Sequence, residues 1–477
     1  MERQTKIIAT LGPACASEQA IDELVAAGMD VARLNFSHGD HAGHRRLAEW
    51  VHEAARHHDR AVALLQDIQG PKIRVGTFPG GEVTLEPGQD LLIRQGSDRA
   101  SPGEVWIDYH HLLDDVEVGE QVAMADGLIR LEVTGKDSGA LRARVIQGGP
   151  LGDRKGVAFP QTELRVPAVT DKDRQDIEFG AELEVDLVAA SFVRSGADVR
   201  QVKELVGETP VIAKIELAAA YERLDEILIE AHGAMVARGD LGVQLPLERL
   251  PLVQRDILER TNTAGRISIV ATEMLESMTA SPRPSRAEVT DVASAVMAGA
   301  DAVMLSGETA VGRYPTRTVQ VMDVIAREIE SGPQHIPRPD VAFLTNERPF
   351  PSATAKAAVE AASDLGLDTI VAFTETGTTA RLLSKYRPAA RIVAFTPAPS
   401  TYRRMALYWG VRPARFDRLD STDEMIAAAE KQLLTEGICR DGQGVVMVAG
   451  IPPNQRASTN LIKLHVIGEG GSGVPRR

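Results

Sequence analysis

Short runs of hydrophobic residues alternate with longer amphipathic stretches over much of the chain. In Ser17–Ala27 the apolar residues recur at helical spacing, with Ser17 placed to cap a helix and Gly28 to end it. Such alternation is typical of βα units around a parallel sheet, and eight units predict an α/β fold, a (β/α)8 or TIM barrel, from residues 1–73 and 164–331. The eight expected strands are Lys6–Thr10, Val31–Phe36, Val62–Asp67, Leu187–Phe192, Val211–Glu216, Ala234–Arg238, Ile267–Thr272 and Ala302–Ser306.

The segment between the third and fourth expected strands has a different pattern. Between residues 82 and 147, stretches such as EVTLEPGQDLLIR alternate polar and apolar residues and are broken by Gly and Asp. This pattern predicts an all-β unit. We therefore expect residues 74–163 to form an inserted β-rich domain that covers the active-site end of the barrel as a lid.

A proline-rich stretch without periodicity follows the barrel and predicts a linker at residues 332–345. Residues 346–477 then return to the α/β pattern and predict a small C-terminal α/β domain, for which a regulatory role is open. Its expected strands are Thr369–Thr374, Arg391–Thr396, Val445–Ala449 and Leu461–Ile467.

Composition and charge narrow the class of protein. Hydrophobic residues make up 43% and charged residues 25% of the chain, and no apolar run is long enough to span a membrane. The first residues do not resemble a signal peptide, so a cytoplasmic protein is expected. A net charge of −14 argues against a nucleic-acid partner, and two distant cysteines, Cys15 and Cys439, argue against a disulfide scaffold or a cysteine zinc site.

Polar residues recur at the carboxyl ends of the expected barrel strands, where TIM barrels carry their reactive groups. Packing alone would place apolar side chains there, so the convergence favours an active site. The residues are Arg33, Asn35, Ser37, Asp67, Lys214, Glu216, Gly239, Asp240, Thr272, Ser306 and Glu308.

Glu216 and Asp240 follow adjacent strands and could bind one Mg2+, which takes few protein carboxylates besides water and substrate oxygens. Solvated loop carboxylates are the alternative. Lys214 precedes Glu216 by two residues on one strand, so both side chains face the same way and the ammonium could neutralise a phosphoryl group or an enolate. An ordinary ion pair is the alternative. Arg33 and Arg74 add fork-shaped donors suited to phosphate.

Five histidines cluster after the second expected strand. They fall along an amphipathic helix without the spacing of metal ligands, so we expect a solvated helix face and no metal site. The five are His41, His44, His52, His57 and His58.

Long motifs of the chain together resemble the pyruvate kinase family. The resemblance implies a TIM barrel, a lid after the third strand, a C-terminal α/β domain and a homotetramer. It also implies the transfer of the phosphoryl group of phosphoenolpyruvate to ADP, giving pyruvate and ATP, the last step of glycolysis. The motifs are TKIIATLGPA, GMDVARLNFSHGD, GPKIR, VAASFVR, VARGDLGV, ATEMLESM, PRPSRAEVTDVASAVMAGADAVMLSGETAVGRYP and STNLIKLHVI.

The resemblance also implies roles for individual residues. Arg33 would contact the transferred phosphoryl group with help from Arg74, Lys214 would stabilise that group and the enolate, and Thr272 would lie near the route of the enolate's proton. Glu216 and Asp240 would ligate Mg2+ or Mn2+. The substrate carboxylate would meet Gly239, Asp240 and Thr272, the nucleotide would meet Asn35, Ser37, His38, Arg74 and Lys155, and a monovalent-cation region would comprise Asn35, Ser37, Asp67 and Lys72.

Several residues differ from those usual in the family, and one set of them predicts how the protein responds to K+. Leu217–Ala220, Ala125 and Glu273 replace residues usual in the family. In QDIQGPKIRV, Ile68, Gln69, Lys72 and Val75 stand where Thr, Lys, Glu and Thr are usual. A bound K+ needs oxygen ligands, which Ile68 lacks, and Lys72 brings a cation of its own. The set resembles the K+-independent branch of the family, so K+ is not expected to be required.

The segment TETGTT in the C-terminal domain could bind the phosphate of a sugar-phosphate or nucleotide effector, because its hydroxyls and amides open a helix. A capped helix start without a ligand is the alternative. The residues concerned are Thr374, Thr376, Gly377, Thr378 and Thr379.

Two rival functions remain open at this point. A lyase or aldolase-type barrel would share Lys214, Glu216 and Asp240 but would not need the lid. A degenerate homologue would bind a sugar phosphate or a protein without turnover.

Overall fold

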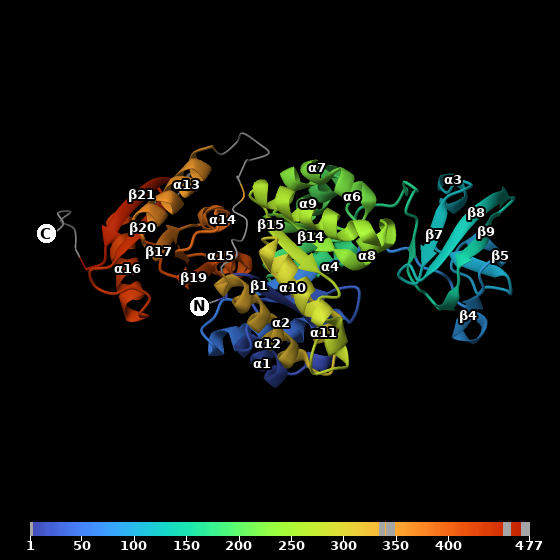
Figure 1. Ribbon diagram of the computed structural model, residues 1–477, viewed down its shortest axis with the longest axis horizontal. Helices are drawn as coiled ribbons and strands as arrows, with labels where there is room; N and C mark the ends of the chain where they lie inside the picture. The colour runs from blue at the N-terminus through green and yellow to red at the C-terminus, as the bar shows by residue number, and fades with distance from the viewer. Residues whose placement is uncertain (1–2, 333–338, 340–348, 452–458, 469–477) are drawn as a thin grey trace.

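The computed structural model describes residues 3–332, 339, 349–451 and 459–468. Three parts follow one another along the longest axis: the C-terminal domain, the barrel and the lid (Figure 1). The predicted linker lies almost wholly outside the described residues.

Eight parallel strands close into a barrel, which confirms the predicted fold. Each contains mostly buried residues, as expected of a parallel sheet covered on both sides. In spatial order around the barrel they are β1 (Lys6–Leu11), β16 (Ala302–Leu305), β15 (Ile267–Ala271), β14 (Gly233–Ala237), β13 (Val211–Ile215), β12 (Leu187–Ala190), β3 (Ala63–Asp67) and β2 (Val31–Asn35).

Helices follow the barrel strands and pack their apolar faces on them. Five begin with a serine, threonine or aspartate whose side chain accepts a hydrogen bond from the first turn, including α1, which starts after Ser17 as predicted. The long helices are α1 (Glu18–Ala26), α2 (His41–His57), α4 (Asp171–Glu182), α5 (Gly196–Val206), α7 (Leu224–Glu230), α9 (Leu250–Thr263), α10 (Arg286–Met297) and α12 (Pro315–Ser331); short ones at the strand ends are α6 (Ala218–Glu222), α8 (Arg238–Gln244) and α11 (Gly307–Ala310).

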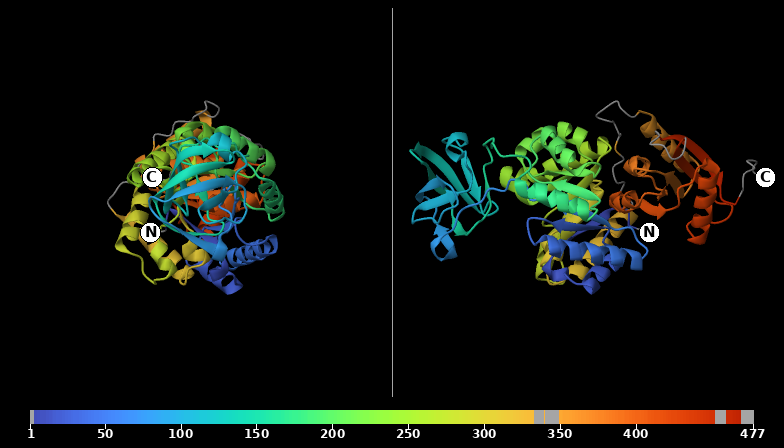
Figure 2. Two further views of the ribbon diagram at one scale, coloured as in Figure 1. Left: turned by 90° about the vertical axis from the view of Figure 1, so that its right-hand side faces the viewer. Right: turned by 180° about the vertical axis from the view of Figure 1, so that it is seen from behind.

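The lid has its own hydrophobic core and lies over one end of the barrel (Figure 2). It holds a six-stranded sheet and a two-stranded sheet, which confirms the predicted β-rich lid, and residues 112–115 add one helical turn, α3 (Leu112–Asp115). Its strands are β4 (Glu82–Leu85), β5 (Asp90–Gln95), β6 (Glu104–Ile107), β7 (Gln121–Met124), β8 (Ile129–Asp137), β9 (Ala140–Gln147), β10 (Gly149–Gly152) and β11 (Val157–Ala158).

The C-terminal domain is a five-stranded sheet, one strand more than predicted, with helices packed against it. The additional edge strand, β19 (Val411–Arg415), contains two arginines and Pro413 and so lacks an apolar pattern. The other elements are α13 (Pro349–Asp364), β17 (Thr369–Phe373), α14 (Thr378–Lys385), β18 (Arg391–Thr396), α15 (Pro399–Arg404), α16 (Thr422–Thr435), β20 (Gly444–Gly450) and β21 (Thr459–Val466).

The C-terminal domain closes the amino-terminal end of the barrel. Side chains inside the barrel, such as Ile8 and Leu65, belong to the same buried cluster as Met405 and Leu407 of this domain. The Lys6 ammonium donates to the Val411 carbonyl across the interface at 2.9 Å. The carboxyl ends of the barrel strands therefore face the lid, at the opposite end of the barrel (Figure 1).

Candidate active site

Lys214 stands at the centre of the charged network at the carboxyl ends of β3, β12 and β13. Its Nζ lies 2.7 Å from Glu216 Oε1 and 3.3 Å from Asp67 Oδ1, and it donates to Ser191 Oγ at 2.7 Å. Only 12% of the side chain is exposed. Burial works against the charge, but Asp67 and Glu216 outweigh it and raise the pKa of Lys214. The site therefore holds a permanent positive charge.

Arg33 adds a second buried cation at the end of β2. Its Nε lies 2.7 Å from Asp67 Oδ2, and its Nη1 donates to Thr10 Oγ1 at 2.9 Å. Burial favours a neutral Asp67, but Lys214 and Arg33 hold its pKa below the usual range. Asp67 is thus a carboxylate that orients both cations.

Glu216 carries a carboxylate that is fully buried beside a second acid. Its Oε2 accepts a hydrogen bond from the Phe192 amide at 2.6 Å, and Phe192 adopts a left-handed conformation with φ of 54°. Burial raises the pKa of Glu216 to about 7, and the charge of Asp240 adds to this rise against the opposite effect of Lys214. Two acidic side chains that lie together at an open pocket fit a divalent cation of the Mg2+ type.

The ends of β14 and β15 are tied together beside this carboxylate pair. The Gly239 amide donates to Thr272 Oγ1 at 2.9 Å, and Thr272 has a left-handed φ of 70°. Arg238 donates to the Thr272 carbonyl and pairs with Asp291 at 2.6 Å. The strained turn therefore presents the first amides of α8 next to Asp240, where an anionic group can approach.

Further cations gather on the β2 side of the site. Burial and the charges of Arg74, Lys72 and Arg33 lower the pKa of His38, so these side chains surround one region. Arg74 donates to the Arg154 carbonyl of the lid at 3.0 Å. These positive charges would attract an anionic substrate locally, although the chain as a whole has a net charge of −14.

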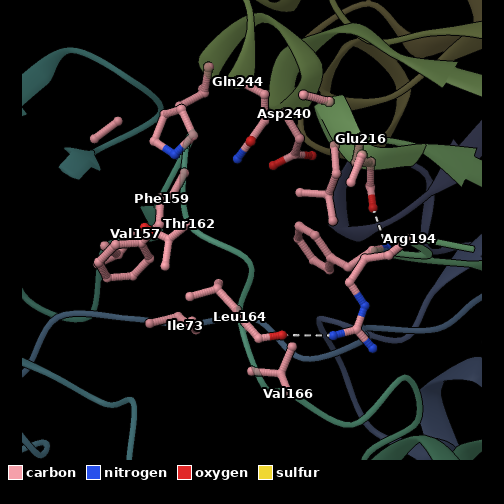
Figure 3. A pocket seen from close by; sticks show the side chains of 18 of the residues that line it. Ile73, Val157, Phe159, Thr162, Leu164, Val166, Arg194, Glu216, Asp240 and Gln244 are labelled. Carbon is pink, nitrogen blue, oxygen red and sulfur yellow. Dashed lines mark hydrogen bonds between the residues drawn. The ribbon is translucent and has the colours of Figure 1, made fainter. Parts of the chain in front are cut away.

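A pocket of about 520 Å³ opens between the barrel and the lid (Figure 3). Glu216 and Asp240 point into it from the barrel, while Val157 and Phe159 face them from the lid. Its other lining residues include Lys72, Asp126, Thr162, Leu164, Arg194 and Gln244.

The predicted residues divide into four groups by their position. Lys72, Glu216 and Asp240 line the pocket, and Arg33, Asp67, Lys214, Gly239 and Thr272 lie in contact networks at the adjoining strand ends. On the loop after β2, the Ser37 amide donates to Asn35 Oδ1 at 3.1 Å. Lys155 is exposed on the lid and does not line the pocket.

Sequence patterns did not point to Ser191, Thr10 or Phe192, which bind Lys214, Arg33 and Glu216 respectively. Ser191 ends the apolar run LVAAS, so its position at a strand end could have revealed it. Thr10 likewise ends the apolar run of the first expected strand, whereas Phe192, which acts through its backbone amide, carries no such signal. Ser306 Oγ is buried without a hydrogen-bond partner, and the Ser306 amide donates to Glu308 at 2.6 Å.

The expectation of a solvated histidine face is wrong for His44, and His41, although exposed, also stacks on an aromatic ring. His44 is buried and stacks on Phe36 with 4.2 Å between ring centroids. His41 stacks on Phe179 at 4.1 Å. The stacking partners come from other elements, so helical spacing alone could not indicate these contacts.

The predicted effector segment begins α14. Gly377 precedes the helix with a left-handed φ of 81°, and its amide donates to Thr374 Oγ1 at 2.9 Å. Thr376 and Thr378 share a hydrogen bond of 3.0 Å, and Thr379 bonds to Thr459 at 2.7 Å. These hydroxyls are therefore partly engaged within the domain.

Comparison with known protein families gives the decisive match. The family model described as pyruvate kinase, barrel domain, matches residues 2–319, and the model described as pyruvate kinase, alpha/beta domain, matches residues 352–465. The chain belongs to the pyruvate kinase family. It is therefore a phosphotransferase, and the lyase or aldolase alternative no longer applies.

Curated relatives named pyruvate kinase cover nearly the whole chain. The one from Geobacillus stearothermophilus is 41% identical over 487 aligned residues, spanning 100% of this chain and 83% of the relative. The one from Sporosarcina psychrophila is 40% identical and spans 98% of this chain and 81% of the relative. One from Staphylococcus epidermidis is 38% identical and spans 99% of this chain and 83% of the relative.

Within the described residues, every helix is too short or too polar to cross a lipid bilayer.

Proposed function

We propose that the chain transfers the phosphoryl group of phosphoenolpyruvate to ADP in the pocket between barrel and lid, with Mg2+ or Mn2+ held by Glu216 and Asp240. The observation that carries the proposal is the placement of the Lys214 ammonium 2.7 Å from Glu216, whose partner acid Asp240 lines the same pocket. A bound divalent ion would neutralise charge on the phosphoryl oxygens.

The chain's own residues would supply the remaining interactions. Lys214 and Arg33 stabilise the negative charge that develops on the phosphoryl group and on the enolate oxygen, because Asp67 fixes both cations at the barrel mouth. Asp67 holds both cations in place. The amides near Gly239 receive the substrate carboxylate, and Thr272 lies beside them to guide the proton that converts the enolate to pyruvate.

The lid would exclude water from the reacting groups. Its connection to the barrel is supported by Arg194, which donates to the Leu164 carbonyl at 3.0 Å and pairs with Asp198 at 3.2 Å (Figure 3). Water in the closed site would otherwise compete with ADP for the phosphoryl group. Pyruvate release from phosphoenolpyruvate, with each substrate and cation omitted in turn, tests this function.

The enzyme is further proposed to work without K+. Ile68 is buried in the barrel core and offers no side-chain oxygen, and Lys72 lines the pocket where its charge can take the place of a monovalent cation. Activity in tetramethylammonium buffer with Mg2+ should be close to that in K+ buffer. Strong activation on titration with K+ would overturn this proposal.

A double variant, Lys72→Glu with Ile68→Thr, sharpens the K+ test. It should make activity dependent on K+, because it restores an oxygen ligand and removes the built-in cation. Lys136→Glu is the matched control, since Lys136 is a lid lysine that pairs with Glu117 at 3.0 Å outside the pocket. A double variant indifferent to K+ would show that the charge comes from elsewhere.

Two further expectations concern a regulatory ligand and the assembly of the protein. A sugar phosphate or nucleotide would bind at Thr374–Thr379, although Glu375 places a negative charge there that pairs with Arg418 at 3.1 Å. Unchanged activity with such compounds, and in Thr378→Ala, would make the segment structural. A homotetramer in the cytoplasm is also expected, and light scattering tests the tetramer.

A further inference from the structure

A second constellation of ligand-type side chains lies on the outside of the barrel, where α1 packs against α2. The Asp22 carboxylate from the middle of α1 meets two consecutive histidines at the end of α2. His57 Nδ1 lies 2.7 Å and His58 Nε2 3.0 Å from the same oxygen, Asp22 Oδ1. Among the residues that the structure describes, this is the only group of three or more such side chains with convergent ligand atoms.

From this geometry we propose that Asp22, His57 and His58 form a binding site for a transition-metal ion of the zinc class, separate from the active site. Two imidazole nitrogens and one carboxylate are a donor set that Zn2+, Ni2+ and Cu2+ accept readily. Mg2+ prefers oxygen ligands and would stay at the carboxylate pair in the pocket. The two sites therefore differ in the ion they select.

The distances permit such an ion after a small movement. Ligand atoms about 2.0–2.1 Å from a tetrahedral zinc are about 3.4 Å apart, so the two nitrogens need to move outward by about half an ångström. The side chains have this freedom, because His57 is 70% exposed, Asp22 33% and His58 25%. Solvent would fill the remaining coordination position.

The end of α2 also favours a cation electrostatically. His57 is the last residue of a 17-residue helix and His58 is its cap, and the carbonyl end of a helix carries partial negative charge. The ion would join α1 to α2. Because the helix of 17 residues is about 25 Å long, the ion would lie far from the loop at residues 35–38 beside the active site.

The test is a Zn2+ titration of the tag-free full chain in competition with a chelating dye, at saturating Mg2+. The wild-type chain should bind one Zn2+. His57→Gln and Asp22→Asn should each weaken binding by ~10-fold or more, because loss of an outer partner of a ligand already costs that much. Pyruvate formation with Mg2+ should be unchanged in His57→Gln.

The lid supplies a matched control in another pair of consecutive histidines, His110 and His111. His111 Nδ1 lies 4.0 Å from Asp114, so no oxygen is shared as in the Asp22 cluster. His111→Gln should leave Zn2+ binding unchanged. Electron paramagnetic resonance of bound Cu2+ should show two coupled imidazole nitrogens in the wild type and in His111→Gln, but one in His57→Gln. Absence of Zn2+ binding by the wild type, or equal binding by His57→Gln, would overturn the proposal.

Discussion

Three buried charges at the barrel mouth depend on one residue, Lys214. Asp67 and Glu216 both contact its ammonium, and Arg33 is oriented through Asp67. The sequence placed Lys214 and Glu216 on one face of a strand, because side chains two residues apart point the same way. The sequence also places Asp67 and Ser191 at strand ends, but it does not indicate that they contact Lys214, since these contacts join strands that are far apart in the chain.

Lys214→Met should lower kcat at least ~100-fold, because a fixed positive charge worth ~3 kcal/mol or more is lost where negative charge develops. Two buried carboxylates, Asp67 and Glu216, also lose their partner in this variant, so its melting temperature should fall.

Lys203→Met is the matched control for the Lys214 prediction. Lys203 also pairs with a glutamate, Glu230, at 3.0 Å, but it is 41% exposed on the outer helix α5. Its loss should leave kcat unchanged. A Lys214→Met enzyme that keeps most of its kcat, measured with a folded sample by circular dichroism, would contradict the assigned role.

At the scale of elements, the cap of α4 holds the start of the lid connection. Asp173 is fully buried and accepts hydrogen bonds from the Gly70 amide at 3.0 Å and from the Thr170 amide and hydroxyl at 2.9 and 2.6 Å. Gly70 has a left-handed φ of 67° and no room for a Cβ, which would lie 3.0 Å from the Ser191 carbonyl.

Asp173→Ala should therefore cost about 2–4 kcal/mol of stability, since it removes the acidic partner of Thr170 in the capping box of α4 and leaves the buried Gly70 amide unpaired. Thermal unfolding of the variant measures the loss. Asp171→Ala, an exposed acid in the same helical turn, is the control and should change stability little. Equal melting temperatures for the two variants would refute the role given to Asp173.

Elements were predictable where a single pattern determined them. The barrel strands are continuous apolar runs, so all eight could be located, whereas β19, with two arginines and a proline in five residues, could not. The histidines of α2 show that a single sequence pattern is also insufficient to predict a binding site. Their spacing says nothing about Asp22, which approaches from α1 only after the two helices pack.

For the whole molecule, a buried ion cluster joins the barrel to the C-terminal domain. Asp301, at the start of β16, pairs with Lys385 and, at 2.8 Å, with Arg387, and Lys385 also donates to Asn262 at 2.8 Å. Two cations face one carboxylate in a dry interface. Burial, with the charge of Arg387 and against that of Asp301, lowers the pKa of Lys385 to about 7.

This pKa predicts a pH dependence of stability. Above pH about 7 the folded chain releases a proton that the unfolded chain retains up to its usual pKa of 10.5, so this residue's contribution to stability rises with pH in that window. The slope is at most about 1.4 kcal/mol per pH unit. The melting temperature of wild type relative to Lys385→Met should therefore be higher at about pH 8.5, which lies within this window, than at about pH 6.5, which lies below it. A constant or falling difference would contradict this account.

The central claim is that this pocket moves a phosphoryl group from phosphoenolpyruvate to ADP, and pyruvate release coupled to lactate dehydrogenase tests it most directly. With Mg2+ and without K+, the wild-type chain should form pyruvate only when both substrates are present, and Lys214→Met should lose at least ~99% of that rate. The claim would be contradicted if the wild type formed no pyruvate, as expected of a degenerate homologue. It would also be contradicted if Lys214→Met formed pyruvate at the same rate as the wild type.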